Sequence, residues 1–294
     1  MATTIGAVRS AGSAEAAFWT QRSMLTFFLV GFGIPWAGWI TMHALGIPSP
    51  RVRPTPLGWA LFLTGDAMSL AGLAATYRGQ GWLGVGALLA RCVRYRLPVG
   101  WWLYAILLPF VWALAVIAAY GLRHGGVGPV RPGGFGSMVA PPVLAMFLTG
   151  PLGEEVGWRG FLLPQLLRRY SVVTASIILG LIWSLWHAPL YYNTVFSTVS
   201  GATYFTVGTV CFSMIMTVMH LNARWSVLLA MMLHWTINIA PRVVAGIFPG
   251  VPAEAVRALR PVSTAALAAT GVVLVIFGGA RLLQRSGGSG QAAG

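Results

Sequence analysis

Charged side chains are scarce in this chain of 294 residues. Only 8% of the residues are charged, 57% are hydrophobic, and the mean hydropathy is +0.75. A soluble domain carries about 25% charged residues, so this sequence has too few to cover a water-facing surface. The composition therefore excludes an ordinary soluble globular protein and predicts one that is embedded in a membrane.

Lysine is absent, so all 19 basic residues are arginines, and the five acidic residues leave a net charge of +14. In a soluble protein this balance would suggest a nucleic-acid partner. Here the arginines stand singly or in small groups between apolar runs, which is the pattern of loops that meet anionic lipid headgroups. We therefore expect a lipid bilayer as a partner and no nucleic acid.

Cysteine is nearly absent as well. Cys92 lies in an arginine-rich stretch and Cys211 lies inside an apolar run. Two cysteines so placed predict neither a disulfide framework nor redox chemistry.

Apolar runs fill most of the remaining sequence and are continuous rather than alternating, which favours helices over the strands of a membrane barrel. A helix needs about 20 apolar residues to cross the bilayer core. The sequence predicts an all-α polytopic membrane protein, a bundle of about eight transmembrane helices. These predicted spans are 24–46, 57–77, 99–120, 137–168, 172–192, 201–221, 225–241 and 262–282.

Eight spans would place both ends of the chain on one side of the membrane. Loops on that side hold more arginines than loops on the other, which predicts cytoplasmic termini in the cell inner (plasma) membrane. The ends are polar or rich in small residues. We therefore expect a flexible cytoplasmic N-terminus over 1–22, a single transmembrane helical domain over 23–283 and a flexible tail over 284–294. Prolines and glycines near 141–151 should kink or delay the fourth helix.

Two of the five acidic residues, Glu154 and Glu155, are adjacent within an apolar span. An ionisable group in a span is costly unless it has a partner, so it marks a functional site by default. Glu155 and Arg159 are four residues apart, on one helix face, which predicts a structural ion pair. Glu154 would then face elsewhere. The alternative is that all three are ordinary charges in an interfacial loop.

Asp66 lies near the centre of the second span. It could pair with an arginine or line the same cavity as the glutamates, and the sequence leaves both possibilities open.

His187, His234 and Asn238 also fall inside predicted spans. If the fourth and fifth helices form a hairpin, Glu154 and His187 lie at one depth, roughly 22–24 Å from the turn at 1.5 Å per residue. His234 and Asn238 would lie roughly 15 and 21 Å along the seventh helix, which enters from the same side. The spacing therefore predicts that four polar groups meet inside the bundle.

Three motifs at these positions resemble a known family. Residues 154–159 read Glu-Glu-Val-Gly-Trp-Arg, Trp183 and His187 stand four apart, and His234 and Asn238 stand four apart. Their order and spacing are similar to the EExxxR, FxxxH and HxxxN motifs of the CPBP family, the CAAX-protease and bacteriocin-processing membrane proteases. Trp183 stands where phenylalanine is usual, an exchange that we expect to leave the chemistry intact.

The resemblance implies an eight-helix intramembrane endopeptidase whose protease core lies at 137–241. Glu154 and His187 would activate water, and His234 and Asn238 would hydrogen-bond the oxyanion. The family has also been described as metal-dependent, and the same four side chains could hold a divalent metal such as zinc. The sequence does not decide between these mechanisms.

The implied substrate is a membrane-embedded or membrane-associated protein or peptide. Prenylated CAAX substrates belong to eukaryotic members, whereas a chain rich in Ala, Gly and Arg but free of lysine is typical of a bacterial protein. The substrate is therefore left open.

Other classes of membrane protein fit less well. An aspartyl protease needs two aspartates and this chain has one, the HExxH motif is absent, and the GxSG pattern occurs only in the C-terminal tail. The remaining alternatives are a non-proteolytic membrane scaffold of the same fold and a small-solute transporter. A transporter would be expected to show two pseudo-symmetric halves with broken helices, whereas the polar groups here lie in the fourth, fifth and seventh spans.

Overall fold

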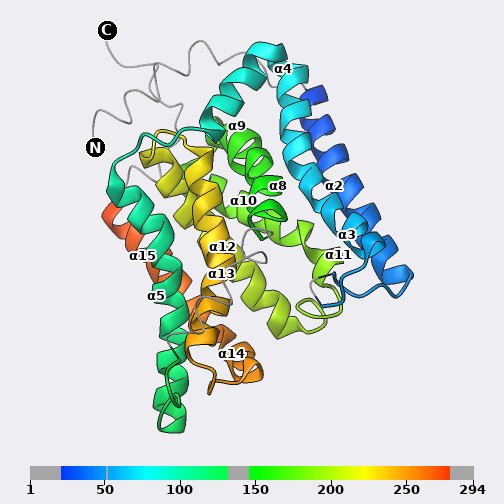
Figure 1. The fold of residues 1–294 in the computed structure, drawn as a ribbon. Coiled ribbons are helices and arrows are strands. Elements are labelled where there is room, and N and C mark those ends of the chain that lie inside the picture. The colour runs from blue at the N-terminus through cyan, green and yellow to red at the C-terminus, as the bar shows by residue number, and fades with distance from the viewer. Residues whose placement is uncertain (1–20, 51, 132–145, 279–294) are drawn as a thin grey trace.

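A computed structural model describes residues 21–50, 52–131 and 146–278 (Figure 1). Within these ranges every regular element is a helix and none is a strand, which confirms the all-α prediction. The predicted flexible ends lie almost entirely outside the described residues. The helical elements are α2 (Gln21–Ala44), α3 (Pro56–Phe62), η1 (Leu63–Asp66), α4 (Ala67–Cys92), α5 (Val99–His124), α8 (Pro151–Glu155), η2 (Val156–Leu162), α9 (Leu163–Leu167), α10 (Val172–Trp186), α11 (Ala188–Tyr191), α12 (Val199–Asn222), α13 (Val227–Ile247), α14 (Ala253–Ala258) and α15 (Arg260–Gly278).

Each of the eight predicted spans contains helix in the described ranges. Five of the described helical segments are long and apolar enough to cross a membrane, and 172–186 and 260–274 form shorter apolar helices. The predicted fourth span is a series of short pieces, α8, η2 and α9. The protein is therefore a multi-pass helical membrane protein.

The second, fifth and seventh spans differ most from their predicted boundaries. The second continues past 77 to a kink at Gly81, whose φ of 62° and ψ of −160° are not helical, and a further helical stretch then runs to Cys92. The seventh continues past 241 through Pro241 to Ile247. There Val244 packs with Ala113 and Ile117 of α5, and this packing offsets the helix-breaking tendency of the proline.

The predicted fifth span, 172–192, is broken at His187, where α10 ends and α11 begins. Pro189 follows two residues later and has no N–H to continue the helical hydrogen bonds. In the fourth span, the residues before 146 lie outside the described ranges, and α8 begins with Pro151 in its first turn, as expected for a proline that cannot donate.

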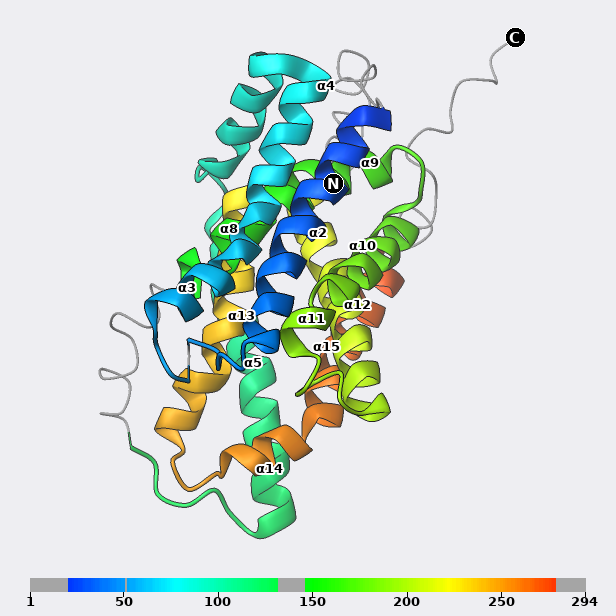
Figure 2. The same cartoon turned by 90° about the vertical axis from the view of Figure 1, so that its right-hand side faces the viewer.

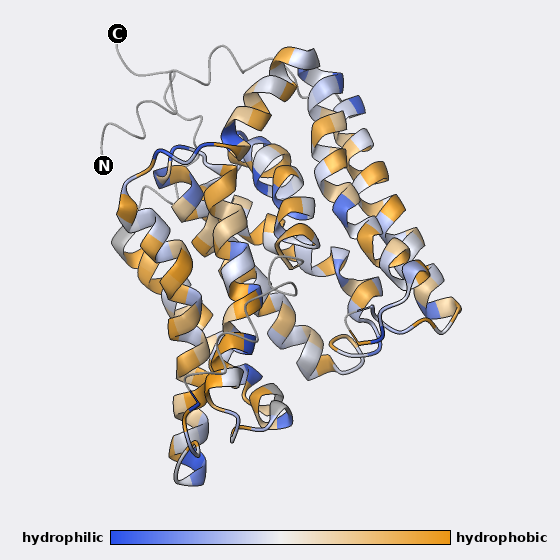
Figure 3. Cartoon of the chain, viewed as in Figure 1, coloured by the Kyte–Doolittle hydropathy of each residue, from blue (hydrophilic) through white to orange (hydrophobic). Residues whose placement is uncertain are grey.

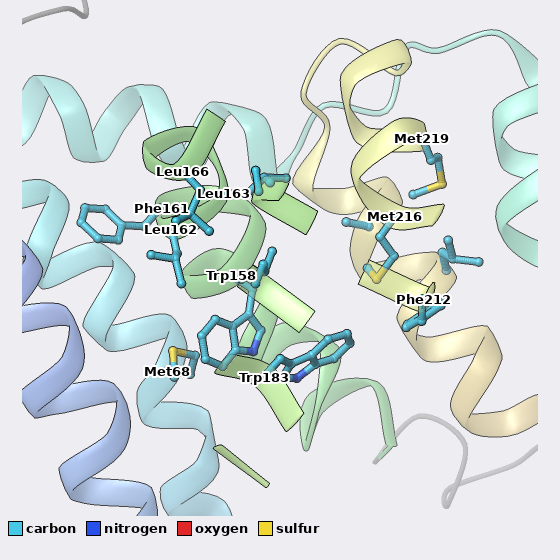
Figure 4. Packing of buried hydrophobic residues seen from close by; sticks show 14 of the residues in the cluster. Met68, Trp158, Phe161, Leu162, Leu163, Leu166, Trp183, Phe212, Met216 and Met219 are labelled. Atoms are coloured by element: carbon cyan, nitrogen blue, oxygen red, sulfur yellow. The ribbon is translucent and has the colours of Figure 1, made fainter. Parts of the chain in front are cut away.

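The short fourth-span segment is enclosed by the longer helices. α2 packs along α4, α4 packs on η2, and α13 packs on both α5 and α8. Figure 2 looks onto α2, which runs between α4 and the α10–α11 segment. The largest cluster of buried side chains joins these elements, and Figure 4 shows residues of η2 and α9 between Met68 of α4 and Met216 of α12. The polar motifs of the fourth span are thus held inside protein rather than against lipid.

The outer surface of the bundle is apolar. Figure 3 shows that hydrophobic residues predominate along α5 and α15. Large apolar side chains on the long helices are exposed, among them Leu70, Leu83, Leu103, Leu107 and Val111. A soluble monomer rarely exposes so much contiguous apolar surface, whereas a bilayer covers it.

Glycines let α4 approach η2 at backbone distance. A Cβ added at Gly157 would lie 2.4 Å from the carbonyl oxygen of Met68, and one added at Gly72 would lie 2.8 Å from the Cα of Gly157. Small residues at membrane helix contacts permit this approach. The contact fixes the depth and orientation of η2.

We predict that Gly157→Ala destabilises the protein by about 1–3 kcal/mol, because the added methyl group meets backbone that cannot move aside. Gly33→Ala is the matched control, since a Cβ at Gly33 of α2 has no neighbour within 4 Å. Melting temperatures in detergent measure the difference. Equal melting temperatures for the Gly157→Ala and Gly33→Ala proteins would contradict the close contact between α4 and η2.

Candidate active site

One cavity brings the four predicted polar residues together. Glu154 of α8, His187 between α10 and α11, and His234 and Asn238 of α13 all line it. Its volume of about 60 Å³ is room for a few water molecules. The depth argument from helix lengths thus places side chains from separate helices at one site.

Glu154 is held by two tryptophans. Its Oε2 accepts a 2.7 Å hydrogen bond from Trp183 Nε1 and a 3.3 Å hydrogen bond from Trp158 Nε1. Figure 4 shows the two indoles side by side beneath η2. With Oε2 occupied in this way, Oε1 is the oxygen available to the cavity.

Oε1 of Glu154 faces the backbone of Gly150, the residue just before α8. A Cβ added at Gly150 would lie 3.8 Å from Glu154 Oε1 and 3.6 Å from Asn238 Nδ2. The carboxylate and the carboxamide therefore face the same point, one as an acceptor and the other as a donor.

Glu155 is the centre of a second, fully buried network. Its Oε1 lies 3.0 Å from Arg159 Nη1 and 2.7 Å from His234 Nδ1, and both Glu155 and Arg159 have no exposed surface. The guanidinium of Arg159 also lies over the Trp183 ring, 4.4 Å from its centroid. The ion pair is therefore tied to the cavity through His234, a connection that the sequence did not indicate.

The segment that follows the two glutamates is wider than an α-helix. η2 is π-helical over 156–162, with hydrogen bonds from i to i+5. Such segments occur mostly as single turns at functional sites. Here the segment begins directly after the two glutamates, so the motif occupies the junction between α8 and η2.

Hydrogen bonds decide which nitrogen of each histidine carries a proton. His187 Nδ1 lies 2.9 Å from the carbonyl oxygen of Trp183, which can only accept, so Nδ1 donates and Nε2 is the accepting nitrogen of the neutral ring. In the same way His234 Nδ1 donates to Glu155. This leaves Nε2 as the ring nitrogen of His234 that can interact with a group in the cavity.

Asp66 lines the same cavity. A Cβ added at Gly153 would lie 2.0 Å from Asp66 Oδ1, so this carboxylate packs directly on the first turn of α8. The cavity position is one of the two possibilities that the sequence left open.

Some atoms of the four residues already have protein partners. One oxygen of Glu154 and one nitrogen of each histidine are directed to protein groups. Among the described residues, no three or more His, Cys, Asp or Glu side chains come together in a way that could hold a metal ion.

A carboxylate, two imidazoles and a carboxamide thus line one cavity within a multi-pass membrane protein. Residues 136–240 match the family described as type II CAAX prenyl endopeptidase Rce1-like. The chain is also 36% identical over 111 residues to CAAX prenyl protease 2 of Methanococcus maripaludis, an alignment that covers 35% of this chain and 41% of that protein. The chain thus matches less than half the length of this curated relative.

The family match spans all three sequence motifs. The resemblance to the CPBP family that these motifs predict is confirmed over the segment that carries them.

Sequence reasoning missed the two tryptophans that hold Glu154. The motif comparison treats Trp183 only as a replacement of one aromatic ring by another, and nothing in it points to Trp158. The signal was present in the spacing: Trp158 follows Glu154 by four residues, which places its donor over the carboxylate on one helix face.

We predict that Arg159→Ala lowers the melting temperature in detergent far more than Glu154→Gln does. Removing Arg159 leaves the Glu155 carboxylate buried without its cationic partner, at about 3–5 kcal/mol. Glu154→Gln is the matched control because its amide oxygen can still accept from the indoles. Equal melting temperatures for the two variants would rule out a structural role for the ion pair.

Proposed function

We propose that this protein is an intramembrane endopeptidase of the CAAX-protease type, which hydrolyses a peptide bond in a membrane-associated protein or peptide. The observation that carries the proposal is the cavity lined by Glu154, His187, His234 and Asn238. The family match and the CAAX prenyl protease relative support the reaction class.

In this proposal Glu154 Oε1 and His187 Nε2 accept hydrogen bonds from one water molecule. As the water oxygen attacks the carbonyl carbon, one of these groups takes its proton and the carbonyl becomes a tetrahedral oxyanion. The same proton is then delivered to the departing amine nitrogen, and the C–N bond breaks to give a carboxylic acid and an amine. The new acid then passes its remaining proton to the amine or to water and leaves as a carboxylate. Both acceptors are directed by hydrogen bonds to protein groups, which supports their orientation.

The oxyanion would be stabilised by His234 Nε2 and the Asn238 amide. Asn238 Nδ2 and Glu154 Oε1 face the same point near Gly150, so a carbonyl there could receive water on one side and a donor on the other. Glu155 supports the role of His234 because its carboxylate accepts a hydrogen bond from Nδ1 and so orients the ring, which would donate from Nε2 when both ring nitrogens carry a proton.

We also propose that both termini face the cytoplasm. The loops after α4 and after α12 lie at one end of the bundle, where Arg94 donates to the carbonyl oxygen of Arg224 and Ser226 donates to that of Arg94. An arginine-rich end is typical of the cytoplasmic side.

The first prediction from this mechanism is that Glu154→Gln reduces cleavage to background while the protein remains folded. Glutamine preserves the shape and the contacts with the indoles but cannot take a proton. The measurement is turnover of internally quenched peptides ending in a CAAX sequence, with and without a prenyl group, in liposomes. A comparison of membrane-peptide termini between wild-type and Glu154→Gln cells would identify natural substrates. Full activity in Glu154→Gln would remove the mechanism and favour a non-proteolytic scaffold.

The second prediction is that Asn238→Ala lowers kcat on the order of 10²–10³-fold, the cost of one oxyanion donor, with little change in KM. Asn222→Ala is the matched control, because Asn222 caps α12 by donating to Val218 and does not line the cavity. Elemental analysis and chelator treatment accompany the assay. Two results together would overturn the oxyanion role of His234 and Asn238: stoichiometric zinc that is lost in His234→Ala, and cleavage that a chelator abolishes. These side chains would then be metal ligands.

A further inference from the structure

The exchange of phenylalanine for tryptophan at position 183 adds a hydrogen-bond donor to the site. Trp183 Nε1 donates to Glu154 Oε2 at 2.7 Å, and both side chains are buried, at 3% and 7% exposure. Phenylalanine could fill the same space but has no N–H. Tryptophan at this position therefore differs chemically from phenylalanine, whereas the sequence comparison suggested that the exchange leaves the chemistry unchanged.

This hydrogen bond is the shorter of the two that Glu154 receives. Trp158 donates to the same oxygen at 3.3 Å. Hydrogen bonds to a charged acceptor are shorter and about twice as strong as neutral ones, and the Trp183 distance lies in that range. Trp183 therefore does more than Trp158 to set the direction of the carboxylate.

The consequence for the reaction is geometric. Because Oε2 is held against Trp183, Oε1 is turned toward the point that it shares with Asn238 near Gly150. Rates fall steeply when a reacting group leaves its productive orientation. Without the donor, Glu154 could rotate and present either oxygen in several directions.

Trp183 also links the two buried networks. Arg159 lies over its ring face, and its ring meets His234 edge to face at 5.1 Å between centroids. A cation over an indole draws on the electron density of the ring, which makes the N–H a better donor. Trp183 is therefore in contact both with the Glu155–Arg159 pair and with Glu154.

We propose that Trp183 is a positioning residue that orients Glu154 for water activation through its indole N–H. The inference rests on the proposed function, in which Glu154 is the proton acceptor. It assigns to Trp183 a role that the phenylalanine usual at this position cannot perform.

The kinetic test is Trp183→Phe, which removes the donor and retains an aromatic ring. We expect kcat for the quenched CAAX peptide to fall roughly 10- to 100-fold, the effect of losing a hydrogen bond to a charged group, with KM within about twofold of wild type. Trp112→Phe is the matched control. Trp112 is also buried and donates its indole N–H, to Thr270 Oγ1 at 3.2 Å, but it lies outside the cavity, so kcat should stay within about twofold.

A second readout reports the contact without any substrate. In ¹⁵N–¹H spectra of the protein in nanodiscs, the indole signal missing from Trp183→Phe belongs to Trp183. That signal should move upfield in Glu154→Gln, because a neutral amide oxygen is a weaker acceptor than a carboxylate. The Trp112 signal, assigned in the same way, should not move.

The outcomes separate this inference from the proposed function. Unchanged kcat in Trp183→Phe beside an inactive Glu154→Gln would overturn the positioning role and leave the protease mechanism intact. An unmoved indole signal would overturn the contact itself. Full cleavage by Glu154→Gln would instead overturn the proposed function, whatever the spectra show. A raised KM and a melting temperature far below that of Trp112→Phe would show that Trp183 is structural only.

Discussion

The arrangement of the site depends on one buried ion pair, between Glu155 and Arg159, in the middle of an apolar bundle. Neither charge has any exposed surface, so each is stable there only while the other is present. The remaining contacts of the pair are with His234 and with the face of Trp183. Through these two side chains the pair contacts α13 and the indole that donates to Glu154. A structural pair and the carboxylate of the proposed site, adjacent in sequence, thus belong to a single packing unit.

Much of this could be predicted from the sequence because the information is local. Hydropathy located the helices, and the four-residue spacing of Glu155 and Arg159 predicted their contact. Helix rise alone predicted that Glu154 and His187 lie at similar depth. The partners of Glu155 and Glu154 could not be predicted in the same way. His234 is 79 residues from Glu155 and Trp183 is 29 residues from Glu154, so both contacts depend on how separate helices pack.

The errors in helix boundaries have a related cause. Hydropathy measures what the bilayer requires, whereas a helix ends where its backbone hydrogen bonds end. α4 continues past 77 to a kink at Gly81 and then resumes as helix up to Cys92, and α13 continues through Pro241 because packing against α5 favours it. In contrast, the break at His187 was signalled locally by Pro189, and it is this break that places the His187 ring at the end of α10 beside the cavity.

The cavity has a consequence for the order of events in the proposed reaction. A space of about 60 Å³ accommodates a few water molecules between Glu154, His187 and Asn238. The attacking water of the proposed mechanism could therefore be in place before a peptide arrives. Substrate binding would then have to bring only the carbonyl group to a nucleophile that is already oriented.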